Sequence, residues 1–197
     1  IPSGTPVFVR QVNGVNADET GNVTVLGSGV NYVVASSAPS DTTTFWLDTS
    51  GGYKRIWELK QKVINEWSTV KWYSPVSTQW SNLPPVYILE TAQSNGIPRC
   101  CGGDTLPNPL VEEYRGGEWT IAQTTHPVFN NIGFQYSKNK ALFENRIVRF
   151  VIVAEASQPI SKWLPDSTKT DEIAAIVREA SIDSFNIILF NYTSTNW

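Results

Sequence analysis

From residue 86 onward, hydrophobic residues gather in three short runs, at 86–89, 146–154 and 185–190. Each run is nearly continuously apolar, which is typical of strands buried on both faces. Segments with helical character lie between them, at about 133–143 and at 171–180. Strands that alternate with helices predict a parallel sheet covered on both sides, so we expect an α/β domain of the doubly wound kind.

The segment at 171–180 carries the clearest helix signals. Thr170 is the expected N-cap, and acidic Asp171 and Glu172 follow in the first turn, where the helix dipole favours negative charge. Apolar side chains at helical spacing predict the buried face of this helix. These residues are Ile173, Ile176, Val177 and Ala180.

Shorter patterns in the first half predict β structure. Residues 44–72 favour a three-stranded meander because β-branched and aromatic residues are frequent there. The expected strands are 45–47, 53–59 and 64–72. Helix is the alternative for 57–70, which also contains good helix formers.

These patterns divide the chain into regions at 1–35, 36–80 and 81–197. In the first region, two β-prone pieces flank a polar turn that ends in Gly21-Asn22, which predicts a hairpin too small to bury a core alone. Prolines in the Ser-rich stretch 73–85 predict a semi-rigid connector, with the domain boundary near residue 80.

Composition narrows the classes of partner. Only 17% of the residues are charged and the net charge is −3, which argues against a basic nucleic-acid-binding face. Eight Trp, seven Tyr and eight Phe suit contact with sugar or protein. We expect Trp46, Trp67 and Trp72 to be core residues, with a sugar platform as the alternative.

The sequence contains few features that indicate membrane insertion, secretion or disulfide bonding. The sequence has no apolar run of membrane-spanning length and no signal-peptide pattern. It begins Ile-Pro-Ser and contains no Met, so we expect that an upstream segment was removed. Cys100 and Cys101 are adjacent and form no disulfide framework, and we predict neither a metal site nor a cofactor.

Ser94 is the first candidate for chemistry. It follows the apolar run at 86–89, and the carboxyl end of a strand in an α/β sheet is where ligands and nucleophiles lie. A Ser that turns there toward a helix exposes its hydroxyl and brings backbone N–H groups to face a developing oxyanion. Ordinary turn chemistry is the alternative for Ser94, and Asn95 beside it is suited to orient such a turn.

Two N-terminal motifs are similar to modules of bacteriophage tail fibres, and together they cover about residues 10–72. The first is carried by Val12-Asn13-Gly14, Asp18 and Gly21-Asn22-Val23-Thr24. The second is carried by Ala38-Pro39-Ser40-Asp41, Trp46-Leu47-Asp48-Thr49, Tyr53-Lys54-Arg55 and Trp67. The resemblance implies a virion protein of the fibre or receptor-binding kind, which acts outside the cell. Its implied partners are other copies of itself (a homotrimer), other virion proteins and host cell-surface polysaccharide.

Residues 84–192 resemble SGNH-type esterases of the sialate O-acetylesterase kind. Three ordered blocks carry this resemblance: Ala92-Gln93-Ser94-Asn95, Asn131-Ile132-Gly133-Phe134 and Ile160-Ser161-Lys162-Trp163. The resemblance implies a flavodoxin-like three-layer domain and a serine hydrolase that acts on carbohydrate acetyl esters. It also implies catalytic roles for Ser94 and for the N–H of Gly133, and substrate contacts by Asn95, Gln158 and Trp163. From the residues alone, a core position for Trp163 and a helix-start role for Gly133 stay open.

The departures from that family fall where the acid and base belong. After the last predicted strand, Asn191-Tyr192-Thr193 stands in place of the family's Gln-Gly-Glu turn, and the sequence ends before its Asp-x-x-His block. We therefore expect the domain to be incomplete at its C-terminus. His126 is the one His, and it is either a base or a structural loop residue. Two hypotheses follow, a glycan O-acetylesterase and a non-catalytic structural or glycan-binding virion component.

Overall fold

The computed structural model describes residues 11–12, 15–16, 31–52, 55–92, 106–123, 132–155 and 159–191. The chain forms two compact units, Ile1–Asn31 and Tyr32–Trp197. In the first unit, β1 (Gln11–Val12) pairs antiparallel with β2 (Val15–Asn16). A short hairpin is therefore present, whereas the turn expected at Gly21-Asn22 lies outside the described residues.

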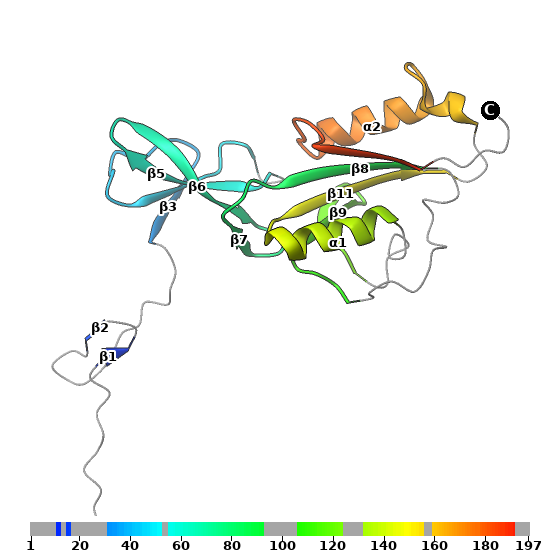
Figure 1. Cartoon of the computed structure of the whole chain (residues 1–197). Coiled ribbons are helices and arrows are strands. Elements are labelled where there is room, and N and C mark those ends of the chain that lie inside the picture. The colour runs from blue at the N-terminus through cyan, green and yellow to red at the C-terminus, as the bar shows by residue number, and fades with distance from the viewer. Residues whose placement is uncertain are drawn as a thin grey trace, which may run out of the picture. The chain divides into compact units, whose positions relative to one another are not determined.

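A five-stranded sheet opens the second unit (Figure 1). Its strands, in their order across the sheet, are β3 (Tyr32–Ala35), β4 (Phe45–Asp48), β5 (Trp57–Val63), β6 (Glu66–Ser74) and β7 (Gln79–Ser81). The pair β3–β4 is parallel, and the other neighbours are antiparallel. The three expected meander strands are present, although the second and third begin later than the sequence indicated. The helix alternative for 57–70 is wrong, because β5 and β6 pair through that segment.

The connector expected at 73–85 needs a correction. β6 extends to Ser74, and β7 within this stretch pairs with it through Tyr73 and Trp80. The rings of these two residues lie 4.8 Å apart, and this contact makes the stretch part of the sheet rather than a spacer. Pro-rich composition hid the strand, since the prolines stand on either side of it.

Aromatic rings pack against one another across this first sheet. Trp80 on one edge strand also meets Tyr32 on the opposite edge strand, at 5.9 Å between ring centroids, so the sheet curls strongly. Trp46 is 7% exposed and packs edge-on against Trp67 at 5.5 Å, which confirms Trp46 as a core residue. Trp72 is only half-buried.

The second sheet has the order β10-β9-β11-β8-β12. The strands are β8 (Val86–Ala92), β9 (Val111–Arg115), β10 (Glu118–Ile121), β11 (Val148–Ala154) and β12 (Ile187–Asn191). All neighbours are parallel except the β9–β10 hairpin. The α/β class and the three expected strands are confirmed. The hairpin was not expected from the sequence.

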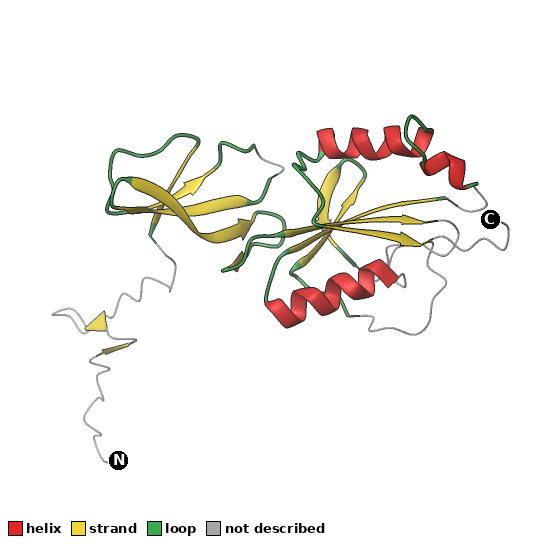
Figure 2. Cartoon of the chain, turned by 45° about the horizontal axis from the view of Figure 1, so that its top comes forward, coloured by secondary structure: helices red, strands yellow, loops and turns green. Residues whose placement is uncertain are grey.

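Two helices cover this sheet, one on each face, as Figures 1 and 2 show. α1 (Ile132–Glu144) lies over one apolar core and α2 (Thr168–Glu179) over the other. Both were expected close to these positions. The N-cap of α2 is Ser167 rather than Thr170, and the hydroxyl of Thr170 donates a hydrogen bond to the Leu164 carbonyl at 2.8 Å.

The expected buried face of α2 is confirmed. Ile173, Ile176 and Val177 pack onto the core that contains Leu89, Val151 and Val153, and Ala180 is buried just after the helix. On the other face, α1 places Phe134 and Ala141 against Ile88 and Phe150. No helix among the described residues has both the length and the apolar content that a bilayer crossing needs.

Candidate functional site

Three parallel strands end together at the carboxyl edge of the second sheet. Ala92 at the end of β8 pairs with Ala154 of β11 on one side and with Asn191 of β12 on the other. The two neighbouring strands follow helices on opposite faces of the sheet (Figure 2). The end of β8 is therefore a topological switch point, the place where open α/β sheets form a crevice.

Ser94 and Asn95 follow Ala92 directly in the sequence but lie outside the described residues. Gln158, His126, Cys100 and Cys101 lie outside them as well. The structure thus gives the position of the strand end and not the side chains that follow it.

Gly133 lies at this same edge, in the first turn of α1, and is buried. A Cβ atom at this position would stand 2.1 Å from Oε2 of Glu90 and 2.8 Å from Cε2 of Phe150. Only glycine allows the start of α1 to approach β8 and β11 so closely. Packing therefore explains why residue 133 is a glycine, and the role of Gly133 as an oxyanion donor stays a prediction.

Glu90 is a residue that sequence reasoning missed. Its side chain is 1% exposed, on the α1-facing side of β8 and two residues before the strand ends. The positive end of a helix dipole is a favourable place for a carboxylate, and Glu90 stands beside the start of α1. The sequence feature that could have indicated Glu90 is a single acidic residue directly after an apolar run.

Trp163 ends the 3₁₀ segment η3 (Ile160–Trp163), which follows β11 and packs against α2. The side chain is half-buried. The hydroxyl of Ser167 donates to the carbonyl of Lys162 and so ties this segment to the helix start. The observed contacts of the segment are structural, and substrate contact by Trp163 stays a prediction.

A buried ion pair lies within the second sheet, on the α2-facing side, and a hydrogen bond from the first sheet is attached to it. Nε of Arg149 donates to Oε2 of Glu112 at 2.8 Å, and both side chains are fully buried. The Ser74 hydroxyl, from β6 of the first sheet, donates to the other Glu112 oxygen. The Arg149 guanidinium lies 4.4 Å from the ring centroid of Trp119. This network fixes the geometry between the sheets, since each charge is costly to bury without its partner.

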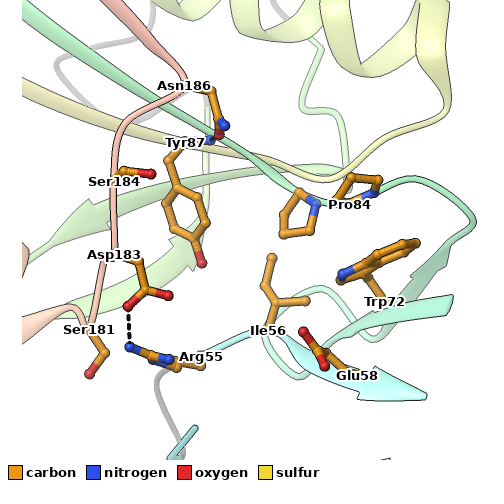
Figure 3. A pocket seen from close by; sticks show the side chains of 11 residues that line it. Arg55, Ile56, Glu58, Trp72, Pro84, Tyr87, Ser181, Asp183, Ser184 and Asn186 are labelled. Atoms are coloured by element: carbon orange, nitrogen blue, oxygen red, sulfur yellow. Dashed lines mark hydrogen bonds and ion pairs between the residues drawn. The ribbon is translucent and has the colours of Figure 1, made fainter. Parts of the chain in front are cut away.

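Near this network, a crevice of about 250 Å³ opens at the amino end of β8 (Figure 3). It lies between the two sheets of the second unit, with Tyr87 on β8 and Trp72 on β6 among its walls. Burial raises the pKa of Tyr87, and the positive charge of Arg149 opposes that rise. The lining residues are Arg55, Ile56, Glu58, Trp72, Pro84, Pro85, Tyr87, Ser181, Asp183, Ser184 and Asn186.

In the part of the chain that the structure describes, no group of three or more His, Cys, Asp or Glu side chains could hold a metal ion. A second cavity, of about 430 Å³, lies between α1 and residues 106–110 and is mainly apolar. Its polar side chains include Lys138, whose ammonium donates to the Leu106 carbonyl.

No protein-family model matches this sequence, and no curated protein is similar to it. Among solved structures, a protein from Arabidopsis thaliana is similar with a TM-score of 0.44 and 14% sequence identity. The similarity covers 55% of this chain and 58% of that one, so the chain spans less than two thirds of its neighbour's length. A likeness at this level carries no argument about function.

Proposed function

We propose that this chain is a fibre-type virion protein whose α/β domain has an SGNH-type, flavodoxin-like fold and removes O-acetyl groups from host surface glycan. The observation that carries the proposal is the position of β8. It is flanked by β11 and β12, and its carboxyl end is the switch point of the sheet. Ser94 is the second residue after that end.

A second observation supports a catalytic site at the same edge of the sheet. Gly133 stands in the first turn of α1, against Glu90 near the end of β8, so its N–H belongs to the free amino end of a helix. The family resemblance places an oxyanion donor at this glycine. Donors fixed in advance at such a position stabilise the charge that develops in acyl transfer.

The reaction is acyl transfer in two steps. The Ser94 oxygen attacks the acetyl carbonyl carbon while a base takes the hydroxyl proton, and the N–H groups of Ser94 and Gly133 hold the oxyanion. The sugar oxygen then leaves with a proton, and water releases acetate from the acetyl-serine. The base is His126 or a His outside this sequence, since the sequence holds one His.

The alternative is a non-catalytic structural or glycan-binding virion component. The steric need for Gly133 favours it, because the close approach to Glu90 explains the glycine without an oxyanion. The sequence at the end of β12 favours it too, since Asn191-Tyr192-Thr193 stands where the family has its Gln-Gly-Glu turn.

Hydrolysis of acetylated host polysaccharide by protein from its native source separates the two. We expect acetate release that falls by more than ~10³-fold in Ser94→Ala, because the nucleophile is lost. Ser68→Ala, an exposed serine on β6, is the matched control and should retain full activity. Full activity in Ser94→Ala would overturn the mechanism, and no activity in the native protein would favour the alternative.

A further inference from the structure

We propose that the crevice at the amino end of β8 is a binding site for an uncharged sugar ring. The inference goes beyond the proposed esterase and does not depend on it, because the crevice and the end that leads to Ser94 lie at opposite ends of the same strand. Nothing in the sequence pattern indicated this site.

Size limits the occupant. A cavity of about 250 Å³ is below the ~300–1,000 Å³ of pockets that hold drug-sized ligands. It suits one small ring rather than an extended cofactor. The crevice is open to solvent through exposed residues such as Asp183 and Ser184, so one unit of a longer chain can enter it.

The two sides of the crevice differ in polarity, as Figure 3 shows. Trp72, Pro84 and Ile56 give one side a mainly apolar surface, with the Glu58 carboxylate beside them, whereas the polar side chains of Asp183, Ser184 and Asn186 stand on the other side with Tyr87. A sugar ring has the matching form, with an apolar C–H face that packs on an aromatic ring and hydroxyl groups around its edge. Aromatic side chains with one apolar face and nearby polar groups are typical of such contact.

The charges of the crevice are already paired. Arg55 and Asp183 form an ion pair of 2.6 Å, and Oε2 of Glu58 lies 3.2 Å from the Lys60 ammonium. A charged ligand would have to compete with these partners. An uncharged ligand can instead use the oxygen and nitrogen atoms that these pairs leave open.

Hydrogen-bonding groups are held in place at the crevice. Oδ1 of Asn186 accepts the Tyr87 N–H at 2.8 Å, and the Asn186 N–H donates to the Tyr87 carbonyl at 2.9 Å. The Nδ2 donors are then the part of this amide that can face a ligand. Gly51 leaves room for the Arg55 side chain, because a Cβ there would lie 2.6 Å from Cδ of Arg55.

The test is titration of the full chain with glucose, galactose and N-acetylglucosamine. Saturation-transfer NMR and tryptophan fluorescence monitor the binding. Single sugars are weak ligands, so Kd is expected at about 1–10 mM. Asn186→Asp keeps the acceptor for Tyr87 N–H and removes the Nδ2 donors, and Asp183→Ala changes an exposed side chain. Each should weaken binding by ~3–10-fold, the range of one hydrogen bond.

Asp171→Ala on α2, an exposed carboxylate that does not line the crevice, should leave Kd unchanged. Equal Kd values in all three variants, or no binding of any sugar by the folded wild type, would overturn the inference. Tighter binding of neutral dipeptide amides than of sugars would also overturn it. The free sugars carry no acetyl ester, so this titration is independent of the hydrolysis assay on acetylated polysaccharide. Sugar binding without polysaccharide hydrolysis would contradict only the esterase proposal. Polysaccharide hydrolysis without sugar binding would contradict only the sugar site.

Discussion

Each of the two five-stranded sheets of the second unit is stabilised by a different kind of interaction. In the first sheet, rings from four strands meet across a curled surface: Trp80 contacts Tyr32 and Tyr73, and Tyr73 also contacts Trp57. In the second sheet, mainly aliphatic residues pack under α1 and α2, together with Trp119 and the two tyrosine rings that it contacts, and charged side chains are buried among them. Buried charge gives less stability than apolar packing would, but it fixes geometry. The buried charges therefore lie in the second sheet, whose strand β8 reaches both candidate sites, one at each of its ends.

The largest expected effect comes from breaking the buried ion pair. Arg149→Met leaves the Glu112 carboxylate buried without its partner, and it should lower the free energy of unfolding by about 3–5 kcal/mol. Glu112→Leu combined with Arg149→Met should recover most of this loss, since neither charge is then left alone. Urea unfolding measures both variants.

Arg178→Met, at an exposed position on α2, is the control for the loss of an arginine. Its expected change is within about 0.5 kcal/mol. If Arg149→Met were as stable as Arg178→Met, the ion pair would contribute nothing, and the contrast between the two sheets would disappear.

A smaller effect is expected in the first sheet. Trp80→Ala removes the ring that contacts both Tyr73 and Tyr32, and it should cost about 2–3 kcal/mol, less than a fully buried Trp because Trp80 is half-buried. Trp80→Phe keeps a ring in the stack and should lose about half as much. A loss within about 0.5 kcal/mol for Trp80→Ala would mean that the ring contacts do not hold this sheet.

The smallest effect concerns Tyr114 on β9, next to the helix that covers the second sheet. Burial raises the pKa of Tyr114 to about 12 from 10.0, and the hydrogen bond and charge of Glu179 add to the rise. The unfolded chain releases this proton near pH 10 while the folded chain keeps it. The stability that Tyr114 contributes is therefore complete below pH 10 and is lost as the pH rises toward 12.

Comparison with Tyr114→Phe isolates this contribution from the other groups that titrate in alkali. Stability falls more steeply in the wild type than in the variant between about pH 9 and about pH 11. Parallel curves from thermal unfolding over that window would show that the environment of Tyr114 does not perturb its ionisation.

The sequence predicted those elements whose own residues carry a strong pattern. β8, β11 and β12 are apolar runs, and α2 has a regular apolar face. β9 was missed because its two glutamates look exposed in the sequence, while Glu112 is buried by Arg149 and Ser74, which lie 37 and 38 positions away. The stabilising partners of a buried charge are not local, so local patterns do not reveal them.

Of the two candidate sites, one could be predicted from local sequence and the other could not. A strand followed by Ser94 is a local signal, so the carboxyl edge of β8 could be proposed from the sequence. The crevice joins Arg55 to Asp183, 128 positions apart, and Trp72 to Tyr87 on different sheets. Only the folded chain brings these residues together, because each one alone is an ordinary surface or strand residue.

The most direct test of the account is to treat the folded protein from its native source with a fluorophosphonate, which reacts with activated serine hydroxyls, and to locate the adduct by mass spectrometry. If Ser94 is the nucleophile, one adduct forms on Ser94, and it is absent in Ser94→Ala and retained in Ser68→Ala. No adduct on Ser94, in protein that circular dichroism shows to be folded, would mean that Ser94 is not an activated nucleophile. The end of β8 would then support binding or assembly without acyl transfer.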